Sequence, residues 1–88
     1  MEIDLETVRQ VFRDVLDGRM TRDAADRWAY GLMQLFEARS LTYSPATEEN
    51  RIWDAVMFLY GIDIMEPPGQ YLLSEEDIRL AMVAKLGI

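Results

Sequence analysis

The sequence predicts a small all-α domain, compact and single over residues 1–88, with four helices and an ordered Pro/Gly-containing loop between the third and fourth. Three observations predict it. Apolar residues recur at steps of three and four along four segments. A residue that caps helices well stands before each segment, namely Asp4, Thr21, Ser44 or Ser74. The chain is 50% hydrophobic with only 3 Pro and 5 Gly, which suits one folded core.

The first two helices are predicted with clear boundaries. Helix one is expected over residues 4–17, with Asp4 as its N-cap and Gly18 just beyond its end. Helix two is expected behind Thr21 and continues to about Arg39. Two apolar stripes support them: Leu5, Val8, Phe12, Val15 and Leu16 in the first, and Ala25, Trp28, Ala29, Leu32, Leu35 and Phe36 in the second.

Helix three is predicted after a loop at residues 40–44. Ser44 is expected to cap it, with Pro45 at the first helical position, where a missing N–H has no cost. The helix is expected to end at Tyr60, before Gly61. Its apolar residues exceed one buried face, because Met57 and Phe58 flank the stripe formed by Ile52, Trp53, Val56, Leu59 and Tyr60.

The last part of the chain combines a loop and a helix. Residues 62–73 contain Pro67-Pro68-Gly69, which cannot continue a helix and suits a turn. This segment is expected to be a long packed loop. Ser74 is then expected to cap helix four over residues 75–86. The sequence also predicts that Trp28 and Trp53 are buried, because each lies on the apolar stripe of its helix.

The residue types argue against catalysis. The chain has no Cys and no His, which removes disulfides, structural zinc, thiol nucleophiles and the commonest general base. Neighbouring carboxylates fall on expected helix surfaces or first turns, where a solvated charge is the usual state. The sequence therefore predicts no enzyme activity, no cofactor and no metal site.

The charge and the apolar runs lead to expectations about partners and location. Nine basic and 16 acidic residues give a net charge of −7, without the basic surface that usually neutralises phosphates, so no nucleic-acid partner is expected. The longest apolar run, Ala55–Tyr60, is far too short to span a membrane, and the acidic N-terminus does not resemble a signal peptide. These features predict a cytoplasmic protein that does not contact membranes.

Two family resemblances bear on function. The stretch Phe58-Leu59-Tyr60-Gly61-Ile62-Asp63-Ile64 resembles acyl carrier proteins, but the Asp-Ser-Leu motif that carries phosphopantetheine in that family is replaced by Ser-Pro-Ala-Thr-Glu-Glu at residues 44–49. A second pattern resembles a group of small, mostly uncharacterised bacterial helical proteins, some of which are toxin-immunity proteins. It runs through Asp17-Gly18-Arg19-Met20-Thr21, Ile52-Trp53 and Pro68-Gly69-Gln70-Tyr71-Leu72.

The interpretation favoured at this point is a non-enzymatic protein-binding domain. Small size, acidity and the lack of catalytic residues suit an immunity or inhibitor protein that blocks a toxin or enzyme. The alternative is a structural or regulatory subunit that forms a homodimer through helix three, and a degenerate acyl-carrier-like protein is a remote alternative. The candidate partner-binding residues are Tyr71, Met65, Asp63 and Glu66 in the loop and Met57 and Phe58 on helix three.

Overall fold

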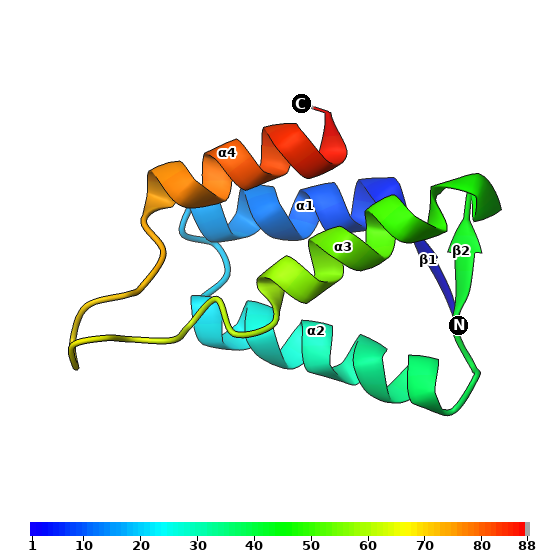
Figure 1. Cartoon of the computed structure of the whole chain (residues 1–88), viewed down its shortest axis with the longest axis horizontal. Coiled ribbons are helices and arrows are strands. Elements are labelled where there is room, and N and C mark those ends of the chain that lie inside the picture. The colour runs from blue at the N-terminus through cyan, green and yellow to red at the C-terminus, as the bar shows by residue number, and fades with distance from the viewer. Residues whose placement is uncertain (88) are drawn as a thin grey trace.

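The computed structural model describes residues 1–87, so the last residue of the expected domain lies outside the description. The elements are β1 (Glu2–Asp4), α1 (Leu5–Leu16), α2 (Arg22–Glu37), β2 (Thr42–Ser44), the 3-10 helix η1 (Ala46–Glu48), α3 (Glu49–Leu59) and α4 (Glu75–Leu86). The four helices run alternately in opposite directions, and α3 packs against each of the other three (Figure 1). The radius of gyration is 12.8 Å, close to the ~12 Å expected for a compact chain of this length.

The helix starts follow the predicted caps. The Asp4 carboxylate accepts from the Thr7 N–H at 2.7 Å. The Thr21 hydroxyl accepts from the Ala24 N–H at 3.0 Å. Ser74 and Asp77 form a reciprocal capping box at the start of α4, in which each side chain accepts from the other residue's N–H. Local hydrogen bonding at these three positions therefore sets the helix starts.

The expectation of a strictly all-α fold is wrong, because β1 and β2 form a two-stranded parallel sheet with Ile3 opposite Tyr43. The first strand precedes α1, and the second lies in the segment expected to be a loop. Ile3 is 1% exposed and belongs to the core. A three-residue strand is too short to show the alternation that predicts strands from sequence.

The start of α3 also differs from the prediction. Ser44 ends β2, Pro45 is the N-cap of η1, and no side chain caps η1 or α3. The α-helix begins at Glu49, four residues later than Pro45. Ser44 pairs with Asp4 in the sheet, and its hydroxyl does not cap α3.

One core lies between the helices. Its largest fully buried side chains are Phe12, Ile3, Ile52, Leu59, Ile62, Ile78, Leu86, Val8 and Val56. Trp28 and Trp53, which the sequence predicts to be buried, both pack against this core and are partly buried. Within residues 1–87, no helix is long and apolar enough to cross a membrane.

Candidate functional site

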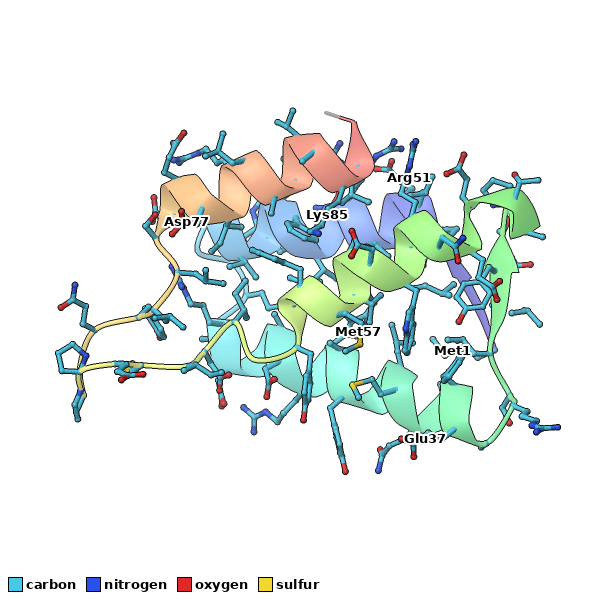
Figure 2. The ribbon with its side chains drawn as sticks, in the orientation of Figure 1. Met1, Glu37, Arg51, Met57, Asp77 and Lys85 are labelled. Carbon is cyan, nitrogen blue, oxygen red and sulfur yellow. The ribbon has the colours of Figure 1, made fainter. Side chains whose placement is uncertain are left out.

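A row of exposed and partly exposed large side chains runs along the junction of α2 and α3. We call it the aromatic strip and define it by Tyr30, Met33 and Phe36 of α2, Trp53 and Met57 of α3, and Tyr60 just after the end of α3. Because the two helices run in opposite directions, low-numbered residues of one lie beside high-numbered residues of the other (Figure 1). Figure 2 shows Met57 on the side of α3 that faces α2.

The two ends of the aromatic strip are stacked ring pairs. Phe36 and Trp53 have ring centroids 4.7 Å apart with an interplanar angle of 28°. Tyr30 and Tyr60 have centroids 6.3 Å apart at 20°. Phe36 and Tyr30 are each 48% exposed, so about half of each side chain is in contact with water. The strip therefore offers exposed aromatic surface against which another planar group can pack.

Few positive charges are free to bind an anionic partner. Among the described residues, six of the nine cationic side chains form ion pairs with carboxylates: Arg9, Arg13, Arg27, Arg51, Arg79 and Lys85. Arg22 is used in hydrogen bonds to backbone carbonyls. Arg19 and Arg39 form no ion pair within residues 1–87. A broad phosphate-binding surface is therefore absent from this part of the chain.

Two arginines nevertheless border the aromatic strip. Arg27 lies one helical turn before Tyr30, and its partner Asp23 is highly exposed, so the pair is weak in water. Arg39 follows the end of α2, three residues after Phe36, and has a left-handed backbone with φ of 58°. Each end of the α2 side of the strip thus has an arginine three residues away in the sequence.

The loop candidates Tyr71, Met65, Asp63 and Glu66 belong to a second feature, which we call the arm (residues 62–73). The arm extends away from the helices beyond the end of α3 (Figure 1). Met65 and Tyr71 form an antiparallel bridge, and the Leu72 N–H donates to the Ile64 carbonyl at 2.9 Å. Met65 and Tyr71 are both exposed, so neither is a buried lid.

Asp63 differs from Glu66 in its surroundings. Partial burial, followed by the charges of Asp26 and Asp23, raises the pKa of Asp63 above its ordinary value. Asp26 itself accepts from the Gly61 N–H at 2.6 Å, which fixes the entrance to the arm. Within residues 1–87 no group of carboxylates has an arrangement that could hold a metal ion.

The two helix-three candidates do not belong to one surface. Met57 is exposed and lies in the aromatic strip. Phe58 is half-buried and stacks on Phe12 with ring centroids 5.8 Å apart, with Lys85 Nζ 5.9 Å from its ring. Sequence reasoning named Met57 as a candidate but missed Phe36 and Trp53, because helical periodicity assigns both to the core.

The comparisons with known proteins concern nearly the whole chain. A family model described as "YxzC DNA-binding protein" matches residues 2–83. A curated protein of Bacillus subtilis (strain 168), named "Uncharacterized protein YxzC", is 28% identical over 74 residues, which is 84% of this chain. The chain spans about half the length of that relative, 54%. No solved structure matches.

These matches overturn several expectations. The resemblance to toxin-immunity proteins is wrong, since the family and the relative are of a different kind. The family's description conflicts with the expected inhibitor function and with the two alternatives, a homodimer through helix three and an acyl-carrier-like protein. It also conflicts with the expectation that nucleic acid is not a partner. Net charge is a sum over the chain, whereas a contact depends on local groups, so −7 did not exclude DNA.

Proposed function

Since the chain belongs to the YxzC DNA-binding protein family, we propose that it binds DNA, and that it does so through the aromatic strip with a preference for unpaired bases. The family match over residues 2–83 supports DNA as the partner. The stacked and exposed rings of Phe36 and Tyr30 support the mode of binding. The proposed role is binding without catalysis.

Electrostatics favours single strands over duplex in this proposal. Duplex DNA carries about one negative charge per ~1.7 Å of axis, and a protein binds it mainly by neutralising phosphates. This chain has a net charge of −7, and most of its cationic side chains are already paired. Base stacking on aromatic rings does not require phosphate neutralisation and contributes about 1–3 kcal/mol per base.

The geometry of the strip is consistent with a short stretch of unpaired nucleotides. Two stacked ring pairs lie at its ends, and Met33 and Met57 occupy the positions between them. Thioether side chains adapt their shape to different planar partners. Arg27 and Arg39 are placed to contact phosphates at the two ends while the bases lie on the rings. In a bacterium such a role belongs to the cytoplasm, the location expected from the sequence.

The test is fluorescence anisotropy with labelled DNA of about 20 nucleotides, single-stranded and duplex, at low salt. The single strand should bind at least about tenfold more tightly than the duplex. Tyr30→Ala should weaken single-strand binding about tenfold, because it removes one stacking face. Leu80→Ala is the matched control, because Leu80 is an exposed apolar residue on α4, away from the strip.

Two results would contradict the proposal in different ways. If neither DNA binds at protein concentrations up to ~1 mM, the chain does not bind DNA by itself. If the duplex binds more tightly, or if Leu80→Ala weakens binding as much as Tyr30→Ala, DNA binding stands and the aromatic strip is the wrong surface.

A further inference from the structure

A cavity of about 460 Å³ lies where the end of α2, the connection to β2 and the start of α3 meet. Its lining residues are Phe36, Glu37, Arg39, Leu41, Tyr43 and Glu49. This volume is within the ~300–1,000 Å³ range of sites that take small ligands. Phe36 belongs both to this cavity and to the aromatic strip, so the cavity is continuous with the proposed DNA-binding surface.

The apolar walls of the cavity suit a planar ring. Phe36 is fixed from behind by its stack on Trp53, which leaves the remainder of its ring for a ligand. Tyr43 is held in β2 opposite Ile3, and Leu41 precedes that strand. Walls fixed by a ring stack and by a strand lose little conformational freedom when a ligand enters.

The polar groups of the cavity are mainly acceptors. Glu37 and Glu49 supply two carboxylates, and neither forms an ion pair with any residue in 1–87. An ionised carboxylate only accepts hydrogen bonds, so both groups suit N–H or O–H donors on a ligand. Arg39 is the single cation in the lining and can reach a neighbouring phosphate.

Tyr43 carries an unpaired polar atom beside this cavity. Its hydroxyl oxygen is buried and has no hydrogen-bond partner among the described residues. Burial, and then the charge of Glu49, raise the pKa of Tyr43 above its ordinary value. An unmade hydrogen bond of this kind is unusual in a region that serves only packing.

We propose that this cavity accepts one unpaired nucleobase with an exocyclic amino group, with cytosine as the case tested, which stacks on Phe36 and donates from that amino group to Glu37 or Glu49. The proposal rests on the proposed function and adds base preference to it. Carboxylates read the amino group of cytosine in other protein–DNA contacts. Thymine has no amino group, and its one N–H donor lies between two carbonyl oxygens that a carboxylate repels, so it should bind less tightly than cytosine.

The experiment compares labelled oligo(dC) and oligo(dT) of about 15 nucleotides in fluorescence anisotropy with the wild-type chain. Oligo(dC) should bind about tenfold more tightly than oligo(dT), the size of one good carboxylate–amino contact. The substitution at the carboxylate that accepts the amino group, Glu37→Gln or Glu49→Gln, should reduce that ratio severalfold. Glu76→Gln is the matched control, since it removes the same charge from the exposed first turn of α4 and should leave the ratio unchanged.

The outcomes separate this proposal from the one on which it rests. If both oligonucleotides bind with equal affinity, or oligo(dT) binds better, the base pocket is wrong while DNA binding stands. If the preference for oligo(dC) survives both glutamate substitutions, the pocket is likewise wrong. If neither oligonucleotide binds, DNA binding itself fails, and the pocket fails with it. Thermal melting of each variant checks that the glutamine substitutions leave the fold intact.

Discussion

The guanidinium of Arg22 lies over the ring of Tyr71, 4.1 Å from its centre. The same guanidinium donates to the Leu73 carbonyl at 2.5 Å and to the Ile62 carbonyl at 3.4 Å. These two carbonyls are at the two ends of the arm. The side chain of Arg22, the first residue of α2, therefore holds both ends of the arm against α2 by hydrogen bonds. It also makes a cation–π contact with Tyr71, an aromatic residue of the arm.

Arg22→Ala should release the arm. Hydrogen bonds from a charged donor contribute about 1.5–3 kcal/mol, and the loss of this donor leaves two partly buried carbonyls unpaired. Amide hydrogen exchange should accelerate at Leu72, whose N–H donates within the arm. Arg22→Lys is the control, because it keeps the charge but not the forked donor geometry, so it should restore exchange protection only in part. Unchanged exchange at Leu72 in Arg22→Ala would contradict this role.

The stack of Phe36 on Trp53 should appear as a coupling energy in a double-mutant cycle. Phe36→Leu and Trp53→Leu, singly and together, should give a coupling of about 1 kcal/mol in the free energy of unfolding, measured by chemical denaturation. The control cycle pairs Phe36→Leu with Phe12→Leu, because Phe12 stacks on Phe58 instead. That second cycle should be additive within about 0.5 kcal/mol. Equal coupling in both cycles would mean that the stack itself contributes nothing specific.

Binding of single-stranded DNA should depend only weakly on salt. If Arg27 and Arg39 are the phosphate contacts, the slope of log K against log salt should be about −1.4, from about −0.7 for each contact. Arg39→Gln should reduce the slope to about −0.7, whereas Arg79→Gln on α4 should leave it unchanged. A slope steeper than about −4 would show a phosphate-dominated surface, contrary to the proposed stacking mode.

Asp63 should destabilise the fold at neutral pH. Burial, with the charges of Asp26 and Asp23, raises its pKa in the folded state. A carboxyl group whose pKa is raised in the folded state contributes its full stability when the pH is below its pKa in the unfolded chain, about 3.9. This contribution is lost as the pH rises through the pKa of the group in the folded state. Asp63→Asn should therefore melt at a higher temperature than the wild type at pH 7, and this difference should vanish below about pH 4.

Asp77→Asn provides the opposite case for the same measurement. Hydrogen bonds with Ser74 lower the pKa of Asp77, so its contribution is present above the unfolded pKa and is lost as pH falls through the folded pKa. The variant should melt below the wild type at pH 7, and the two should converge in acid. The measurement is thermal melting of Asp63→Asn and Asp77→Asn from pH 3 to pH 7. If both variants shift the melting temperature at pH 7 in the same direction relative to the wild type, this account is refuted.

Ile3→Ala should be among the more damaging single substitutions. Ile3 is 1% exposed, and its strand fixes the register of β2 and of Tyr43. Truncation of a buried isoleucine to alanine costs about 2–5 kcal/mol of the free energy of unfolding. The exposed neighbour Glu2 is the control, and Glu2→Ala should change stability by less than about 0.5 kcal/mol. A cost below about 1 kcal/mol for Ile3→Ala in chemical denaturation would show that β1 is not part of the core.

The four helices, and the starts of α1, α2 and α4, could be predicted because they depend on local interactions. Asp4, Thr21 and Ser74 cap the helices as expected, and α4 has the predicted bounds of Glu75–Leu86. Capping needs only residues two or three positions apart, and an apolar stripe repeats every three or four residues. Both signals can therefore be recognised within a short stretch of sequence.

Pairing between distant segments decided the rest. The parallel sheet joins Ile3 to Tyr43, Arg22 closes an arm that ends at Leu73, and the cavity combines α2, the segment before β2 and the start of α3. The aromatic strip likewise exists only because α2 and α3 lie side by side and leave Phe36 and Trp53 partly exposed. The sheet, the Arg22 hydrogen bond to Leu73 and the Phe36–Trp53 stack link residues 17 or more positions apart, and no local pattern encodes which distant segments meet. Their formation depends on how the apolar surfaces of all four helices are buried together, and only the tertiary structure shows that arrangement.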